Sequence, residues 1–197
     1  MTLPLFSNTF LYNVPSIVAL RHASSELGLH ISWAKTKVQN IGAGQPASNL
    51  LVNGQTMEGV QSFAYLGSVI NSADGSRSEQ LRRIGIAAGN MNSLECIWRQ
   101  PHLLLATRLR LYMTLIVPML LYASETWTST KMDLNHLQAF HMRCQRRIFG
   151  VRWFHKIKNV SITRRTGLLH IGDLIQKHRH ALFGHVARMR THNPQLM

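Results

Sequence analysis

The chain has 197 residues, of which 45% are hydrophobic, and a formal net charge of +14 at pH 7. This composition fits one or two folded domains and excludes an intrinsically disordered chain. The two cysteines, Cys96 and Cys144, exclude a disulfide framework and a Cys-x-x-Cys metal motif, so we expect buried thiols and a reducing compartment. The best apolar run, residues 111–123, is shorter than the ~20 residues of a transmembrane helix, and the first residues lack the basic region of a signal peptide.

The net positive charge comes entirely from the second part of the chain. Residues 1–75 carry three basic and three acidic side chains, whereas residues 76–197 carry 19 basic and 5 acidic ones. A segregated excess of this size favours a polyanionic partner, most simply nucleic acid. The alternative is a basic surface without a dedicated ligand.

Residues 1–75 predict one helix and a small antiparallel sheet. Pro15 can open a helix that ends near Leu27, before Gly28. Asn53-Gly54 supplies the turn of a hairpin over residues 50–57. Further strands are expected over residues 30–33, 36–41 and 60–70, with a loop at 42–46.

From Ser76 onward the apolar spacing becomes helical. The first helix after Ser76 should end near Trp98, and one face of it consists of Leu81, Ile84, Ala88 and Met91. Further helices are expected over residues 101–122, with a bend at Pro118, and over residues 131–149, 160–166 and 171–189. The core stripe of the 131–149 helix consists of Leu134, Leu137, Phe140, Cys144 and Ile148. The predicted fold class is therefore α+β, a small sheet with one helix followed by an all-helical basic region.

Basic side chains are densest around the end of the 131–149 helix. No acidic residue interrupts this patch, which also contains Trp153. Its basic residues are Arg143, Arg146, Arg147, Arg152, Lys156 and Lys158, followed by Arg164 and Arg165. Guanidinium groups bind phosphate oxygens and an indole stacks on bases, so we expect this patch to contact nucleic acid, with a solvated helix face as the alternative. Arg82 and Arg83 are further candidates, although Glu79 is close enough to pair with them locally.

No residue pattern predicts catalysis or metal binding. Nucleotidyl transfer needs two metal ions on closely placed carboxylates, and no two of the eight acidic residues are adjacent or one apart. His178 and His185 share a helix face without carboxylate or thiolate company, so we interpret them as half-buried structural side chains. His141 and Cys144 lack an orienting acid, which favours simple packing over a nucleophile and its base. We therefore expect no catalytic residue, metal or cofactor in this chain.

Several segments, in this order, resemble the polymerase of non-LTR (LINE-type) retrotransposons, and the resemblance covers about residues 20–190. The first two are LGLHISWAKTK at 27–37 and FAYLGS at 63–68. The later ones are RRI at 82–84, LRLY at 109–112, LYASETW at 121–127, RCQRRIFGVRW at 143–153 and FGHVARM at 183–189.

This resemblance implies a role for each segment. Lys35 and Lys37 would lie near the incoming nucleotide at the edge of the palm. A primer-grip hairpin that holds the 3′ end of the growing strand would contain Phe63, Tyr65, Leu66 and Gly67. The thumb would begin at Arg82 and Arg83, which would follow the nucleic-acid backbone. The implied domains are a partial palm over residues 1–75, thumb-like helices over 76–130 and a basic C-terminal extension over 131–197.

The family's Tyr/Phe-Ala-Asp-Asp loop should precede the first helix, and no Asp stands there. By resemblance the parent enzyme is an RNA-directed DNA polymerase that uses Mg²⁺, but we expect this chain alone to be inactive. We expect a truncated or decayed element copy limited to binding RNA, DNA or their hybrid, with no membrane partner. One alternative is a segment of an active enzyme whose upstream catalytic part belongs to the same gene, and another is a helical protein-interaction module. An intracellular, even nuclear, location would follow from the parent's life cycle.

Overall fold

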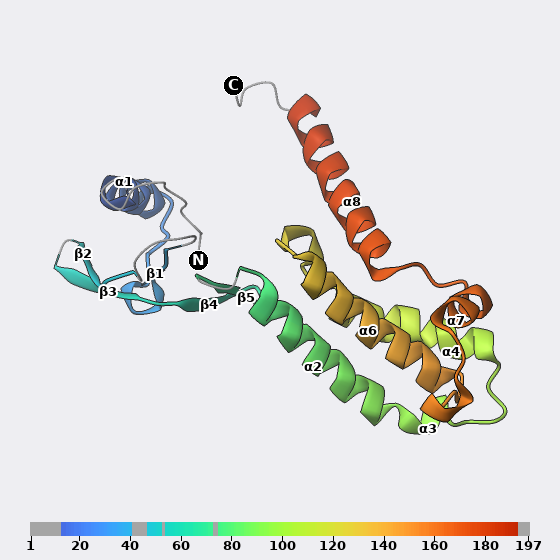
Figure 1. Cartoon of the computed structure of the whole chain (residues 1–197). Coiled ribbons are helices and arrows are strands. Elements are labelled where there is room, and N and C mark those ends of the chain that lie inside the picture. The colour runs from blue at the N-terminus through green and yellow to red at the C-terminus, as the bar shows by residue number, and fades with distance from the viewer. Residues whose placement is uncertain (1–12, 41–46, 53, 73–74, 193–197) are drawn as a thin grey trace. The chain divides into compact units, whose positions relative to one another are not determined.

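The structure is a computed structural model that describes residues 13–40, 47–52, 54–72 and 75–192. The chain divides into two compact units (Figure 1). The N-terminal unit comprises residues up to 65 together with 70–73, and the helical unit comprises residues 66–69 together with 74 onward. Small sheets occupy the first part of the chain and helices the second, so the predicted α+β class is confirmed. The predicted domain limits at residues 75 and 130 stay predictions.

The N-terminal unit opens with helix α1 (Asn13–Glu26), close to the predicted bounds. Gly28 ends it in the left-handed conformation, at a φ of 71°. The predicted strand over residues 30–33 is wrong, because the backbone there enters a short 3-10 turn, η2 (Trp33–Lys35). The Thr36 amide closes this turn on the Trp33 carbonyl and the Thr36 hydroxyl donates to the Ser32 carbonyl at 2.9 Å.

A three-stranded sheet follows, in the order β1-β3-β2. Strands β2 (Leu50–Val52) and β3 (Gln55–Gly59) form the predicted antiparallel hairpin around Gly54, whose φ is 77°. Strand β1 (Lys37–Val38) pairs with β3 in parallel, so the sheet is mixed and not purely antiparallel as predicted. The expected strand at 36–41 is thus shorter, and the expected loop at 42–46 lies outside the described residues.

The predicted single strand over residues 60–70 is a hairpin, made by β4 (Ser62–Tyr65) and β5 (Ser68–Asn71). Leu66 and Gly67 turn the chain with φ values of 48° and 78°. Two successive positive φ angles are typical of a tight hairpin turn, and Gly67 adopts its angle without strain. A hairpin at 63–68 is also what the family resemblance implied.

The helical unit follows the predicted order with finer divisions. Its first half consists of α2 (Arg77–Ser93), α3 (Glu95–Trp98), α4 (Leu105–Leu111), the π-helical turn η3 (Tyr112–Ile116), α5 (Val117–Leu120) and the 3-10 turn η4 (Ser124–Thr126). Its second half consists of α6 (Lys131–Ile148), the 3-10 turn η5 (Trp153–His155), α7 (Asn159–Thr166) and α8 (Ile171–His192). Pro118, where a bend was predicted, lies in the first turn of α5, directly after the π-helical turn.

Helix α6 is central, since it contacts α2, α4, α7 and α8 (Figure 1). A capping box at Thr130 and Asp133 starts it, and Gly150 follows its end at a φ of 68°. Its predicted core stripe is confirmed, with Leu134 partly buried and Leu137, Phe140, Cys144 and Ile148 buried. The helix therefore folds as its apolar spacing predicted.

Helix α2 differs from its predicted face. Ile84, Ala88 and Met91 pack on the core as predicted, but Leu81 is 50% exposed. Glu79, Gln80 and Arg83 are buried in its place, each with hydrogen bonds. The prediction of two buried thiols is also only half right, because Cys144 is buried and Cys96 is exposed.

Helix α8 is anchored by its first turns. Ile171 and Ile175 are buried in the core, and Ser124 and His178 share a hydrogen bond of 3.0 Å between Oγ and Nδ1. Arg179 donates to the Trp127 carbonyl. His178 and His185 are exposed rather than half-buried. Further along, the helix leaves apolar side chains exposed, at Leu182, Phe183, Val186 and Met189.

Candidate nucleic-acid interface

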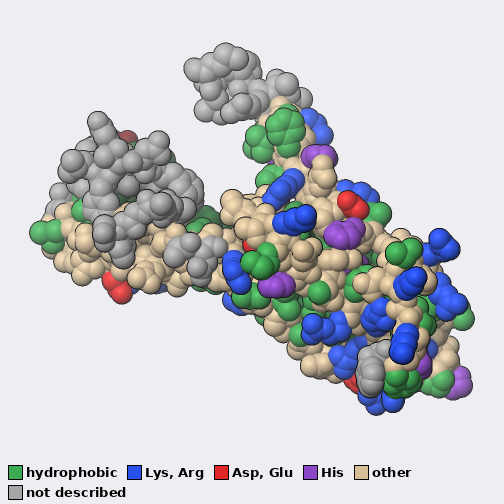
Figure 2. Space-filling view, viewed as in Figure 1, with side chains coloured by type: hydrophobic (Ala, Val, Ile, Leu, Met, Phe, Trp, Pro, Cys, Tyr) green, Lys and Arg blue, Asp and Glu red, His purple; other side chains and the backbone are tan. Residues whose placement is uncertain are grey.

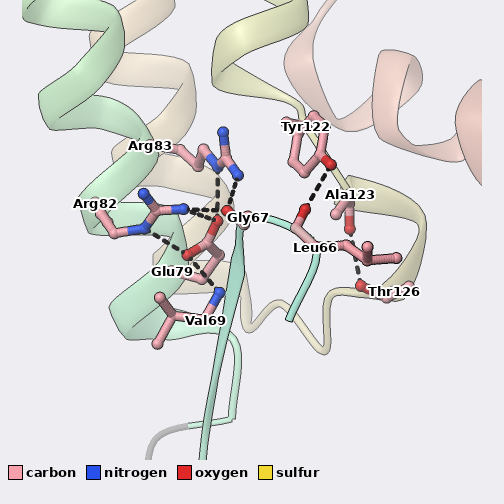
Figure 3. A network of polar contacts seen from close by, with 9 residues as sticks. All are labelled: Leu66, Gly67, Val69, Glu79, Arg82, Arg83, Tyr122, Ala123 and Thr126. Carbon is pink, nitrogen blue, oxygen red and sulfur yellow. Dashed lines mark hydrogen bonds and ion pairs between the residues drawn. The ribbon is translucent and has the colours of Figure 1, made fainter. Parts of the chain in front are cut away.

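The tip of the β4–β5 hairpin is fixed by three side chains of α2 (Figure 3). The Gly67 carbonyl accepts hydrogen bonds from the Nη2 atoms of Arg82, at 2.6 Å, and Arg83, at 2.5 Å. Glu79 accepts from Nε of Arg82 at 2.8 Å and from Nε of Arg83 at 2.6 Å. It also accepts from the Val69 amide at 3.0 Å. One carboxylate and two guanidinium groups therefore fasten the hairpin tip to the first turns of α2.

Glu79 is only 1% exposed, yet it remains ionised in this network. Burial alone would raise the pKa of its carboxyl, but hydrogen bonds from Arg82, Arg83 and the Val69 amide outweigh it and leave the pKa lowered. Pairing with Glu79 in turn raises the pKa of Arg82. Arg82 and Arg83 were both predicted to contact nucleic acid. In the structure they stabilise the fold, and both pair with the single negative charge of Glu79. Their local pairing with Glu79 was anticipated from the sequence.

Tyr122 holds the same hairpin tip from the other side (Figure 3). Its hydroxyl donates to the Leu66 carbonyl at 2.7 Å, and the Arg83 guanidinium carbon lies 4.2 Å from the centre of its ring. The Leu66 side chain is 75% exposed, so the tip presents it outward on an anchored backbone. No sequence motif around Tyr122 or Glu79 predicts that these residues anchor the hairpin tip.

The other predicted N-terminal positions lie in the N-terminal unit. Phe63 and Tyr65 are half-buried in β4. Lys35 is exposed in η2. Lys37 is exposed and forms an ion pair with Glu58, its neighbour in the parallel pairing of β1 and β3. Of the positive charges predicted here, Lys35 is the one without a carboxylate partner in the described structure.

Two arginines of the predicted patch at the end of α6 also serve the fold. Arg146 donates to the Ile157 carbonyl and to Oδ1 of Asn159, both at 2.7 Å, which ties α6 to the start of α7. Arg147 donates to Oδ1 of Asn92 at 2.6 Å and forms an ion pair with Glu95. Both guanidinium groups are therefore engaged before any ligand binds.

The remaining basic side chains of the patch are exposed. None of them forms a side-chain hydrogen bond or an ion pair with another described residue. These side chains are Arg143, Arg152, Lys156, Lys158, Arg164 and Arg165. No acidic residue lies between Asp133 and Asp173 in the sequence. Figure 2 shows Lys and Arg side chains gathered over the part of the helical unit where α6 ends and α7 lies. Trp153 has its backbone in η5, and its side chain lies outside the described part of the structure.

These six exposed cations, which we call the α7 basic face, have the chemistry of a phosphate-binding surface. Guanidinium groups donate paired hydrogen bonds to phosphate oxygens, and lysines add mobile point charges. Because none of these six cations forms an ion pair with a described carboxylate, their positive potentials add. This face is the candidate interface.

A buried polar cluster in the core is the nearest approach to a catalytic arrangement. The Tyr112 hydroxyl lies 2.7 Å from Nδ1 of His141, and both side chains are fully buried. Burial lowers the pKa of His141 to about 4, although the Leu169 backbone opposes it, and burial raises the pKa of the Cys144 thiol to about 12. The imidazole is therefore neutral and the thiol protonated near pH 7, which is the chemistry of packing and not of a nucleophile with its base.

The packing role predicted for His141 and Cys144 stays a prediction, and it did not include Tyr112, whose hydroxyl lies beside His141. No group of three or more His, Cys, Asp or Glu side chains in the described residues could hold a metal ion. No helix in the described ranges is long and apolar enough to cross a bilayer.

Comparison with known proteins gives one informative similarity. A transposon-derived protein of Caenorhabditis elegans, F52C9.6, is 29% identical over 139 residues, which is 64% of this chain and 46% of the relative. The chain thus spans about half the length of that relative. No protein-family model and no solved structure matches the chain. The chain is therefore distantly similar to a transposon-derived protein, and no family is assigned.

Proposed function

We propose that this chain is the nucleic-acid-binding part of a retrotransposon reverse transcriptase, which binds RNA, DNA or their hybrid and does not itself copy a template. A transposon-derived relative supports the origin. The ordered resemblance to LINE-type polymerases supports the finer assignment. The observation that carries the binding is the α7 basic face, six exposed cations with no local carboxylate.

Binding to such a face is driven largely by counterion release. Each phosphate that a cation neutralises frees condensed salt ions, so affinity falls as salt concentration rises. The slope of log affinity against log salt is about −0.7 to −0.9 for each phosphate contact. For one kind of nucleic acid, the slope therefore reports the number of phosphate contacts.

A filter-binding titration across salt concentrations tests this proposal. We expect the full chain to bind an RNA–DNA hybrid at low salt with a steep slope. Replacing the four arginines of the face by Gln should weaken binding and make the slope shallower by about three. Those four are Arg143, Arg152, Arg164 and Arg165.

A charge-matched variant serves as the control. It removes four exposed cations that are not part of the face, at Arg21, Arg77, Lys131 and Lys177. Its slope should stay closer to that of the unmodified chain. Absence of binding at low salt would overturn the proposal, and equal losses in the two variants would remove the α7 basic face from it.

In the parent enzyme, the hairpin tip would position the primer strand. Support comes from its anchoring, because Arg82, Arg83 and Tyr122 fix the backbone at Leu66 and Gly67 while the Leu66 side chain stays exposed. A loop that must hold the end of a strand needs this combination of a fixed backbone and an accessible surface.

A second candidate is a segment of an active polymerase. The relative is more than twice as long as the aligned region, which favours a longer functional unit. Genomic sequence directly 5′ of the Met1 codon decides it, since an in-frame Phe/Tyr-Ala-Asp-Asp would supply the missing carboxylates. A third candidate, a helical protein-interaction module, draws on the exposed apolar side chains of α8 and would gain if nucleic-acid affinity were absent.

A further inference from the structure

An open groove of about 600 Å³ lies beside the α7 basic face. Helix α6 contributes Gln138 and Met142, and helix α7 contributes Val160, Thr163 and Arg164. Leu168, in the connection to α8, also lines it. A space of this size falls within the range of small-ligand sites.

Both walls of the groove are held in place by hydrogen bonds. Gly167, at a φ of 65°, ends α7 and turns the chain toward α8. The Thr166 hydroxyl donates to Oε1 of the buried Gln145 at 2.9 Å, which ties α7 to α6. The Ile171 amide donates to Oε1 of Gln138, also at 2.9 Å, which ties the start of α8 to α6. The groove is therefore a built feature of the helix packing.

The surface of the groove is mainly apolar, with one cation, Arg164, and the polar side chains of Gln138, Asn159, Thr163 and His170. Met142 and Leu168 are buried and half-buried, and Val160 is 68% exposed. The Arg164 guanidinium makes no side-chain bond to another described residue. Since Oε1 of Gln138 is engaged, its amide NH₂ remains as a donor. The matching ligand has a flat apolar face, acceptor atoms on its edge and a negative charge attached nearby.

We propose that this groove receives an unpaired nucleobase of a single-stranded nucleic acid, whose adjoining phosphate binds Arg164. A base has the required flat face and edge acceptors, and its phosphate lies on the side of the neighbouring cations. A duplex cannot enter, because its bases are paired and stacked away from the surface. The inference rests on the proposed nucleic-acid binding and adds to it a preference for single strands.

The test compares two strands that carry the same phosphates. One is a single-stranded oligonucleotide of about twelve nucleotides, and the other is the same backbone with abasic sites in place of the bases. We expect the full chain to bind the intact strand roughly five- to tenfold more tightly than the abasic strand.

Val160→Asp places a charged group at the rim of the groove, at an exposed position near the start of α7 where an acidic residue suits the helix dipole. Ser161→Asp is the matched control, an exposed neighbour with the same added charge that does not line the groove. The preference for the intact strand should fall to near one in Val160→Asp and persist in Ser161→Asp. Charge effects on overall affinity cancel in this ratio.

Three outcomes would overturn the inference. Equal binding of intact and abasic strands would show that the groove does not bind a base, while leaving the proposed function in place. A preference that survives in Val160→Asp would show that the bases are read elsewhere. Absence of binding to either strand at low salt would overturn the proposed function and this inference with it.

Discussion

Arginine residues of this chain divide by what their guanidinium groups contact. Arg83, Arg146 and Arg147 bind carbonyl, amide or carboxylate oxygens of the protein. Arg143 and Arg164 are exposed and carry no such bond within the described residues. Sequence spacing alone does not separate the two groups. Neighbours such as Arg143 and Arg146 differ only in whether another segment of the chain packs against them.

Glu79 provides the sharpest test of the hairpin anchor. Glu79→Gln removes the charge that neutralises the buried Arg83, and we expect it to lower the free energy of unfolding by about 2–4 kcal/mol. Urea unfolding followed by circular dichroism measures this.

The matched control for this change is Glu95→Gln. Glu95 also pairs with two arginines, but its side chain is 28% exposed, so the loss should be about 1 kcal/mol or less. Equal losses in the two variants would show that the buried network is no stronger than a surface one.

His141 should make stability depend on pH. Its folded-state pKa of about 4 lies below its ordinary value of 6.5, so the unfolded chain binds the extra proton between these values. Stability is therefore complete above pH 6.5 and declines as pH falls toward 4, by at most about 3 kcal/mol. Unfolding measured between pH 7 and about pH 5.5 checks this, because carboxyl groups of ordinary pKa stay almost fully ionised in that range.

A variant without the imidazole isolates this contribution. His141→Gln should be less stable at pH 7 and show a flatter decline, whereas His102→Gln, at an exposed position, should follow the unmodified chain. An unchanged decline in His141→Gln would assign the pH dependence to other groups.

At the scale of elements, glycines of the same unit should respond with opposite signs. Gly85 is inside α2 with open space around it, so Gly85→Ala should raise the free energy of unfolding by about 0.5–1 kcal/mol. Gly67 has a φ of 78°, so Gly67→Ala should lower it by about 1 kcal/mol. Thermal unfolding of both variants measures the difference, and a gain from Gly67→Ala would contradict the observed turn.

Local signals in the sequence predicted the elements that local forces determine. Gly28, Gly54 and Gly150 each stand where the backbone takes a positive φ, and the α6 stripe is buried as its spacing indicated. Long-range contacts were not predictable in this way. The parallel pairing of β1 with β3 and the split of residues 60–70 into two strands depend on partners distant in sequence or on a turn at Leu66 that its residue type does not favour.

The candidate site shows the same division. The sequence predicted the basic residues themselves, because charge and spacing are local properties. It did not predict that Gly67 and Leu66 carbonyls would bind Arg82, Arg83 and Tyr122, nor the groove between α6 and α7. Both arise from packing between elements, which a single sequence does not display.

At the scale of the whole molecule, the two units should differ in stability. In the N-terminal unit, Val52 and Met57 are the described apolar side chains that are fully buried, whereas one continuous core joins the helices of the other unit. Small sheets with little buried apolar surface open readily. We expect amides of β2 and β3 to exchange with solvent well before those of α6.

Native-state hydrogen exchange read by mass spectrometry measures this difference. Uniform protection across β3 and α6 would contradict it and would indicate one cooperative unit.

We also expect the isolated chain to associate, because α8 leaves Phe183 75% exposed beside other apolar side chains. A sharp monomer peak in gel filtration would count against that.

Dicarbonyl reagents such as phenylglyoxal attack guanidinium groups that water can reach, so the division among the arginines amounts to a built-in chemical footprint. Arg143, Arg152, Arg164 and Arg165 should be labelled early, together with other exposed arginines such as Arg21. Arg83 should be labelled last, since it is 8% exposed and bound on two sides. Adding polyanion to the reaction should then slow the labelling of Arg143, Arg152, Arg164 and Arg165 and leave that of Arg21 unchanged, so adduct formation maps where a ligand binds without any mutation.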